Sequence, residues 1–396
     1  MNMNEQMKES EESILHTYNR FPVVFEKGQG CYLYDSEGKE YLDFAAGIAV
    51  NSLGYHYPGY DEALKDQIDK LMHISNLYYN EPIIEAGAKL VKASKMSKAF
   101  FTNSGTEAIE GALKAAKKYA YVRDGHADHE IIAMNHSFHG RSIGALSVTG
   151  TAHYREPFEP LMGGVKFADF NDFESVKAQI TDKTCAIITE VVQGEGGIYP
   201  AKKEFLEGLR QICDEKDIML IFDEIQCGMG RTGHYFAWQA YGVQPDIMTS
   251  AKALGCGVPV GAFVLSEKAA KASLEPGDHG TTYGGNPFVC AAVSKVFDIY
   301  ENDKIIEHVQ EMTPYLEQKL DEIVAKHECA ATRRGMGFMQ GIVIQGRPVG
   351  EVVKAALAKG LLVISAGSDV LRIVPPLVIT KEHIDKMAAI LDECME

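Results

Sequence analysis

Two spacings of hydrophobic positions alternate through the middle of the chain. Short apolar runs bounded by polar residues are typical of strands buried on both faces. Between these runs, apolar residues recur every three or four positions, which is typical of helices that pack one face on a core. The predicted strands lie at 99–101, 131–134, 185–192, 218–222 and 246–250, and the predicted helices at 104–123, 202–217 and around 236–241. Strand and helix in alternation predict an α/β fold, with a mostly parallel sheet covered by helices on both faces.

The two ends of the chain have a different pattern. Residues 31–44 alternate apolar and polar positions around a turn at 36–38, which predicts a hairpin. From about residue 286 the chain is rich in helical patterns, followed by predicted strands at 361–365 and 371–374. A last helix opens at Thr380 and carries an apolar stripe of Ile384, Met387, Ile390 and Leu391. We therefore expect a large α/β domain at 46–285 and a smaller α+β lobe built from 1–45 and 286–396.

Composition and charge exclude some classes of function. The 396 residues are 46% hydrophobic and carry a formal net charge of -16, without a Lys/Arg-rich block. Nucleic-acid binding needs a concentrated basic surface, so no nucleic-acid partner is expected. The first residues are polar, and the apolar runs are too short to cross a bilayer, so no membrane association is expected. The eight cysteines are scattered singly, which favours a reduced, cytoplasmic protein over a disulfide framework.

Three patterns resemble known sites but lack the context that these sites need. Residues 228–233 match G-x-G-x-x-G, but a dinucleotide fingerprint should open a helix inside a βαβ unit near the start of a fold, whereas here Arg and Thr fill the variable positions and His-Tyr-Phe follows. Residues 218–224 resemble the acidic strand of a nucleoside triphosphatase, but the chain has no GK[ST] loop. His126, His129, His136 and His139 have a spacing that a metal could use, although their polar neighbours favour a solvated loop. No metal site is expected.

Five groups of residues at predicted strand ends carry possible chemistry. Ser104 and Thr106 start a helix whose N-terminus favours an anion, or they are an ordinary helix cap. Phe138 could stack on a flat heteroaromatic ring, and the guanidinium of Arg141 could bind a carboxylate. The alternative for Phe138 is an ordinary residue of the hydrophobic core. Glu195 is a glycine-flanked carboxylate in the segment 193–197, at an edge of the sheet where ligands bind.

The last two groups follow buried strands directly. Asp223 must be paired with a cation or protonated, and a pyridinium nitrogen or a structural arginine would satisfy it. Lys252 lies between a strand and a glycine-rich turn, where loss of hydration lowers the pKa of an amine and suits Schiff-base chemistry. The alternative for Lys252 is a surface lysine at a strand exit. Each group alone is weak evidence for a functional site, but the five groups in this order along the chain are stronger evidence.

In that order, the motifs resemble the class-III (ω-amino acid) aminotransferases of the fold-type I pyridoxal-phosphate enzymes, and the acetylornithine subgroup in particular. The resemblance runs nearly end to end, through YLDFAAGIAVNSLGYHYP, NSGTEA, SFHGR, QGEGG, DEIQCGMGRTG, TSAKALG, HGTTYGGNP and LRIVPPL. It implies a large domain with a mostly parallel seven-stranded sheet and pyridoxal 5'-phosphate as cofactor.

By this resemblance, Lys252 holds the cofactor as a Schiff base and later moves a proton. Asp223 keeps the pyridine nitrogen protonated, and Gln226 bonds the phenolate oxygen of the ring. Phe138 stacks on the ring, while Gly105 and Thr106, next to Ser104, bind the phosphate. Thr282 is implied to reach that phosphate from a neighbouring subunit, which would make a homodimer with shared active sites obligatory.

The resemblance also implies how substrates are bound. Arg372 is expected to grip the α-carboxylate of glutamate or 2-oxoglutarate, and Glu195 to mask Arg372 when the ω-amine is present. Arg141 takes the carboxylate of acetylornithine, or the distal carboxylate of glutamate. The implied ping-pong reaction converts N-acetylornithine and 2-oxoglutarate to N-acetylglutamate semialdehyde and glutamate, as in arginine biosynthesis.

Other substrates and functions stay open at this point. Succinylornithine, N-succinyl-diaminopimelate and 4-aminobutyrate aminotransferases share the motifs, as does glutamate-semialdehyde aminomutase. Gly47 stands where an ornithine aminotransferase would have a tyrosine for the free α-amino group, so it favours an acylated substrate. Cys256 replaces a glycine common in its turn. A non-catalytic protein on this fold would be expected to lack Lys252 or Asp223.

Overall fold

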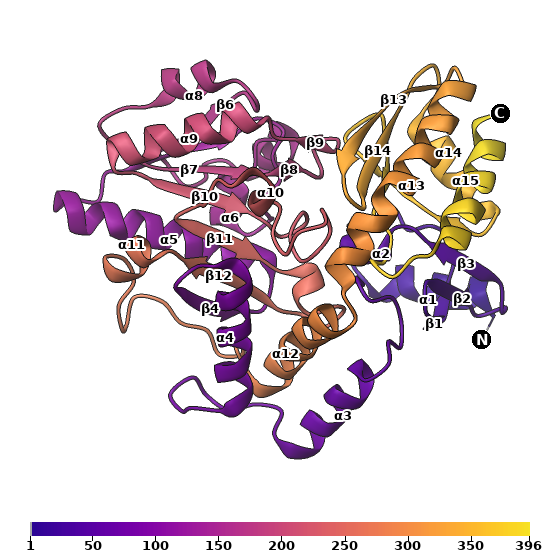
Figure 1. The fold of residues 1–396 in the computed structure, drawn as a ribbon, viewed down its shortest axis with the longest axis horizontal. Coiled ribbons are helices and arrows are strands. Elements are labelled where there is room, and N and C mark those ends of the chain that lie inside the picture. Colours follow the sequence, from indigo (N-terminus) through magenta and orange to yellow (C-terminus); the bar gives the residue numbers. More distant parts are fainter. Residues whose placement is uncertain (1) are drawn as a thin grey trace.

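A seven-stranded sheet forms the centre of the larger part of the molecule in the computed structural model, which describes residues 2–396 (Figure 1). Its strands lie in the order β4 (Lys98–Thr102), β12 (Gly261–Leu265), β11 (Ile247–Ser250), β10 (Met219–Asp223), β7 (Thr184–Glu190), β5 (Glu130–Met134) and β6 (Val165–Ala168). Only β12 runs antiparallel to its neighbours, so the other six strands share one direction. The expected α/β fold is confirmed.

Helices cover both faces of this sheet because alternate strand residues point to opposite sides. Ile187, Leu220 and Met248 pack in a core with helix α9, whereas Ile188, Ile221 and Ile247 pack with helix α5. The helical segments of this part are α4 (Glu81–Ser94), α5 (Gly105–Asp124), α6 (Ile143–Ser147), α7 (Ala152–Arg155), η1 (Glu156–Phe158), α8 (Phe173–Gln179), α9 (Lys203–Lys216), α10 (Trp238–Tyr241), η2 (Lys252–Leu254) and α11 (Glu267–Lys271).

Strands from both ends of the chain meet beside the central sheet. Strand β2 (Tyr32–Asp35) pairs with β1 (Phe25–Gln29) on one side and with its hairpin partner β3 (Glu40–Asp43) on the other, and β3 also pairs in parallel with β15 (Leu361–Leu362). A second sheet has the order β13 (Ala330–Met336), β14 (Met339–Ile344), β17 (Val370–Ile373) and β16 (Ile364–Ala366). A short hairpin joins β8 (Val192–Gln193) to β9 (Tyr199–Pro200). The domain limits at residues 45 and 285 stay a prediction.

The remaining helices connect and cover these sheets. The long helix α12 (Pro287–Asn302) runs beside α4 and α3 and leads toward the smaller lobe (Figure 1). The others are α1 (Met3–Ser13), α2 (Ala46–Ala49), α3 (Tyr60–Lys70), α13 (Ile305–Lys326), α14 (Val349–Ala358) and α15 (Lys381–Met395). Thr380 is the N-cap of α15, as predicted. Within residues 2–396, no helix combines the length and the apolar character needed to cross a membrane.

Two predicted strands differ in the structure. The run at 185–192 ends as a sheet strand at Glu190, and Val192 belongs to the short hairpin instead. The run at 361–365 is split at Val363, so that its first part pairs with β3 and its second part with β17. Continuous apolar runs do not reveal such breaks, because the sheet with which each piece pairs is decided by residues elsewhere in the chain.

The G-x-G-x-x-G segment at 228–233 connects the two lobes. Arg231 in this segment is 1% exposed and donates hydrogen bonds to the carbonyl oxygens of Phe338 and Pro375 in the C-terminal part of the chain. A buried guanidinium needs such acceptors because its charge has lost water. The segment therefore fixes the position of the lobes relative to each other, which explains a motif that the sequence left without a function.

Candidate active site

A cavity of 380 Å³ lies at the carboxyl edge of the central sheet. Six strands end there because they share one direction, and the loops that follow them converge on this edge. The cavity is lined by loops after β4, β5, β7, β10 and β11, and by Val50 from the N-terminal part. Residues far apart in the sequence thus meet in one pocket.

Most of the residues predicted for the site line this cavity. The lining includes eight of them: Ser104, Gly105, Thr106, Phe138, Glu195, Asp223, Gln226 and Lys252. The other three, Arg141, Arg372 and Thr282, do not belong to the lining. Their surroundings differ and are described below.

Lys252 follows β11 directly and adopts a left-handed backbone conformation, with φ of 49°. Non-glycine residues adopt this conformation at some cost, and such residues cluster at functional sites. The pKa of the Lys252 amine is lowered to about 8, mainly by burial and also by the positive charge of Arg372, whereas Glu195 and Asp223 act in the opposite direction. A large fraction of this amine is therefore neutral, and nucleophilic, near pH 8.

Asp223 ends β10 and is 4% exposed. One of its oxygens lies 2.7 Å from Nδ1 of His139, and the other accepts hydrogen bonds from the backbone N–H of Ile225 at 3.0 Å and the hydroxyl of Thr249 at 3.2 Å. These contacts fix the carboxylate at the floor of the cavity. A buried carboxylate held in this way is suited to bind a cationic ring nitrogen.

The N-terminus of α5 forms another wall. Ser104 is its N-cap and accepts the backbone N–H of Glu107 at 3.3 Å. The hydroxyl of Thr106 contacts the hydroxyl of Ser142 at 2.7 Å. The first N–H groups of a helix lack partners within the helix, so this end of the 20-residue α5 suits a phosphate.

Arg372 and Glu195 form an ion pair next to the cavity. Nη1 of Arg372 lies 2.6 Å from Oε1 of Glu195 and donates at 3.1 Å to the side-chain oxygen of Gln226. The Arg372 side chain is 3% exposed, whereas that of Glu195 is 25% exposed. The arginine comes from β17 of the C-terminal part, so the pair bridges both parts of the molecule. A carboxylate of a substrate would compete with Glu195 for this guanidinium.

Arg141 is exposed, and its guanidinium lies 5.0 Å from the ring of Tyr154 and 5.9 Å from that of Phe138. It therefore stands beside the ring that faces the cavity and is free to meet a carboxylate from solvent. Thr282 is exposed outside the cavity of its own chain. Sequence reasoning did not single out Tyr154, nor Glu190 at the end of β7.

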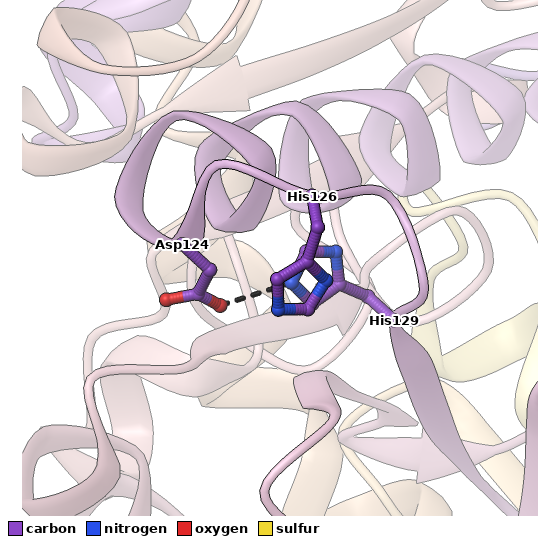
Figure 2. A group of neighbouring side chains, drawn as sticks. All are labelled: Asp124, His126 and His129. Atoms are coloured by element: carbon purple, nitrogen blue, oxygen red, sulfur yellow. Dashed lines mark hydrogen bonds and ion pairs between the residues drawn. The ribbon is translucent and has the colours of Figure 1, made fainter.

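The four spaced histidines do not gather in one place. His139 contacts Asp223, and His136 is exposed. Figure 2 shows His126 and His129 with Asp124, where Nε2 of His129 lies 2.9 Å from the carboxylate. The two rings are stacked at 4.8 Å with 13° between their planes, and one nitrogen of each ring lies within 4.8 Å of the other and of a carboxylate oxygen of Asp124.

Asp124 is already engaged in that group, because both of its oxygens accept hydrogen bonds from Arg123 at 2.6 and 2.7 Å. Arg123 holds the pKa of this carboxyl well below its usual range. His129 is buried, in contrast to the expected solvated loop, whereas residues 124–128 before it are exposed.

Comparison with known proteins gives matches over nearly the whole chain. Residues 14–395 match the family model described as aminotransferase class-III. The chain is 47% identical to an acetylornithine aminotransferase of Clostridium acetobutylicum, over 98% of this chain and 100% of that protein. It is 44% identical to a succinylornithine transaminase of Yersinia pseudotuberculosis, over 94% of this chain and 92% of that protein.

Among solved structures, an ornithine aminotransferase from Toxoplasma gondii superposes with a TM-score of 0.95 at 28% identity, covering 100% of this chain and 94% of that one. That structure has partial occupancy of PLP at its active site.

In protein from which any bound cofactor or ligand has been removed, Lys252 should react with trinitrobenzenesulfonate faster than exposed lysines near pH 8. Its rate should rise through pH 8 and then level, because the neutral amine reacts and its pKa is about 8. Exposed lysines as a group should continue to gain reactivity at higher pH. Mass mapping of labelled peptides between pH 6 and 10 measures both rates. A Lys252 rate that follows the exposed lysines over the whole range contradicts the lowered pKa.

Proposed function

The chain belongs to the class-III aminotransferase family, and we propose that it transfers the terminal amino group of N-acetylornithine to 2-oxoglutarate. The products are N-acetylglutamate semialdehyde and glutamate. The observation that carries this proposal is the ion pair of Arg372 and Glu195 beside the Lys252 amine. An arginine that is masked by a movable carboxylate allows one pocket to accept an uncharged group in one half-reaction and a carboxylate in the other.

The enzyme uses pyridoxal 5'-phosphate, and the cavity fits this cofactor. The helix N-terminus at Gly105 and Thr106 suits the phosphate, and the buried carboxylate of Asp223 suits the protonated ring nitrogen. Lys252 supplies an amine that is neutral enough to bond an aldehyde carbon. When bound, the cofactor accepts the amino group and withdraws the electrons that are released at the substrate carbon.

The side chains of this protein bind, orient and move protons in our proposal. Asp223, oriented by His139, keeps the proton on the ring nitrogen, and Phe138 covers the ring face. Gln226 donates its amide N–H to the phenolate oxygen, since its own carbonyl oxygen is occupied by Arg372. With the cofactor bound, Lys252 would use its Nζ to move a proton between the substrate carbon and C4′ of the cofactor.

Specificity follows from the two arginines. Arg372 binds the α-carboxylate of glutamate or 2-oxoglutarate once Glu195 has turned away. Arg141 binds the carboxylate of N-acetylornithine, or the distal carboxylate of glutamate. Gly47 offers no side chain to a free α-amino group, which fits an acylated substrate. Succinylornithine is the second candidate, because a succinylornithine transaminase is 44% identical.

We further propose a homodimer with shared active sites. Leu77 and Tyr79 are 87% and 96% exposed, and Tyr283 is 62% exposed, although all are large and hydrophobic. Asn76 donates to the carbonyl of Gly284 at 2.8 Å, so the two exposed segments lie side by side. Contiguous exposed apolar surface is typical of an interface. Thr282 lies in this surface, where it can reach the phosphate of a neighbouring chain.

The substrate is tested by the colour of the cofactor. Purified protein should be yellow, and N-acetylornithine should bleach it within one turnover, because the amino group passes to the cofactor. The same absorbance trace with succinylornithine, ornithine and 4-aminobutyrate ranks these substrates. Lys252→Ala is the control. It should lack the absorbance of the Schiff base between cofactor and lysine, and it should show no turnover. Colour that persists with N-acetylornithine but is discharged by 4-aminobutyrate would make the substrate assignment wrong.

Replacing Arg372 by Ala should separate the two half-reactions. The KM for 2-oxoglutarate should rise about tenfold to a hundredfold, since a charge-assisted bidentate contact is lost. The N-acetylornithine half-reaction should change much less. Single-turnover absorbance measures each half separately. Arg333→Ala is the control. The guanidinium of Arg333 lies 2.7 Å from the carboxylate of Asp321, and neither residue lines the cavity. Equal losses in both half-reactions would contradict the role of Arg372.

Complementation tests the shared site. Chains with Lys252→Ala and chains with Thr282→Ala should each have low activity. Co-expression should restore activity in mixed dimers, because one of the two sites then combines an intact Lys252 with an intact Thr282. About a quarter of all sites are restored if the chains mix at random. If Thr282 acts within its own chain, mixed dimers isolated by two affinity tags regain nothing.

A further inference from the structure

Glu190 lies beside Asp223 at the floor of the site. It ends β7, and the register of the parallel strands pairs it directly with Asp223 at the end of β10. The two residues are 5% and 4% exposed. Two neighbouring carboxyl groups are thus buried where water cannot stabilise them, which is costly unless hydrogen bonds compensate.

The carboxylate of Glu190 connects the two loops that shape the cavity. One oxygen accepts the backbone N–H of Phe138 at 3.1 Å, and the other accepts the backbone N–H of Gly194 at 2.9 Å. Phe138 faces the cavity, and Gly194 immediately precedes Glu195, the partner of Arg372. One side chain therefore holds the ring-facing loop and the loop of the ion pair in a fixed relation.

A carboxylate is the side chain that this position requires. It has two equivalent acceptor oxygens, whereas an amide has one acceptor and one donor. Burial raises the pKa of Glu190 to about 7, and Asp223 contributes in the same direction, while His139 and the two backbone N–H groups oppose the rise. Gly194 fits closely here, because a Cβ atom would lie 2.6 Å from the side chain of Gln226.

We propose that Glu190 is a positioning residue of the aminotransferase, which fixes Phe138 against the cofactor ring and Glu195 against Arg372 through these two backbone N–H groups. Glu190 also lines the cavity, but the role proposed for it is exerted through the two loops that it holds. The inference rests on the proposed function, since both loops matter through cofactor and substrate binding.

Glu190→Gln tests this role with a nearly isosteric side chain. The amide oxygen keeps one N–H, but the NH₂ group faces the other N–H and pushes that loop away. We expect the visible circular-dichroism band of the bound cofactor to change, the dissociation constant of the cofactor to rise about tenfold, and the KM for 2-oxoglutarate to rise more than kcat falls. Dichroism and cofactor affinity need no substrate, so they test the inference even if N-acetylornithine is not the substrate.

Glu224→Gln is a matched control. Glu224 is also buried, its pKa is also raised to about 7 by burial, and it also accepts two backbone N–H groups, those of Ala237 and Trp238 at 2.8 Å each. Neither of these residues lines the cavity. This variant should lose thermal stability to a similar extent, with the dichroism band and the KM values unchanged.

Glu190→Asp provides a second variant that keeps the charge but shortens the reach, so it should show the same spectral change. Two results would overturn the proposal. One is a loss of stability in Glu190→Gln equal to that of Glu224→Gln, with unchanged dichroism, cofactor affinity and KM. The other is failure of both Glu190 variants to fold while Glu224→Gln folds, because the carboxylate would then serve folding rather than the positions of the two loops.

Discussion

Burial of charge at the carboxyl edge of one sheet is the constraint on which this site depends. Six strands of common direction end at this edge, and they bring Glu190, Asp223 and Lys252 into a region with little water. Each charge must then find a partner inside the protein. His139 contacts Asp223, two backbone N–H groups satisfy Glu190, and the amine of Lys252 responds with a lowered pKa. The chemistry of an aminotransferase uses an amine whose pKa is lowered in this way.

The smaller lobe contributes the cation of Arg372 beside the cavity. Arg372 extends from β17 to Glu195, so the position of the C-terminal sheet decides whether the pair can form. The buried Arg231 belongs to the larger part and stabilises that position by donating hydrogen bonds to the carbonyl oxygens of Phe338 and Pro375 in the C-terminal part. Two arginines thus connect the lobes, one with a structural role and one beside the cavity. Glu195 is more exposed than Arg372, and our proposal therefore assigns the movement to Glu195.

The predicted elements agree with the structure where the apolar positions of a whole segment follow a single helix or strand pattern. The helix predicted at 104–123 corresponds to α5, and the strand predicted at 131–134 corresponds to β5. Agreement is lost where a continuous apolar run serves two sheets, as at Val192 and Val363. Motifs gave eight residues that line the cavity, but they did not single out Glu190. Its only signal in the sequence is an acidic residue inside an apolar run, three positions before a glycine-rich segment begins with Gln193.

The sequence by itself determined the fold class, the family and the identity of the residues that follow each strand, because periodicity and motif order are local properties of the chain. Only the tertiary structure decided which of these residues meet. The contacts between Glu195 and Arg372, and between Asp223 and His139, join residues 177 and 84 positions apart. Their distances depend on strand order and lobe packing. The same holds for the pKa of Lys252, since burial by distant segments sets it, and no local pattern contains that information.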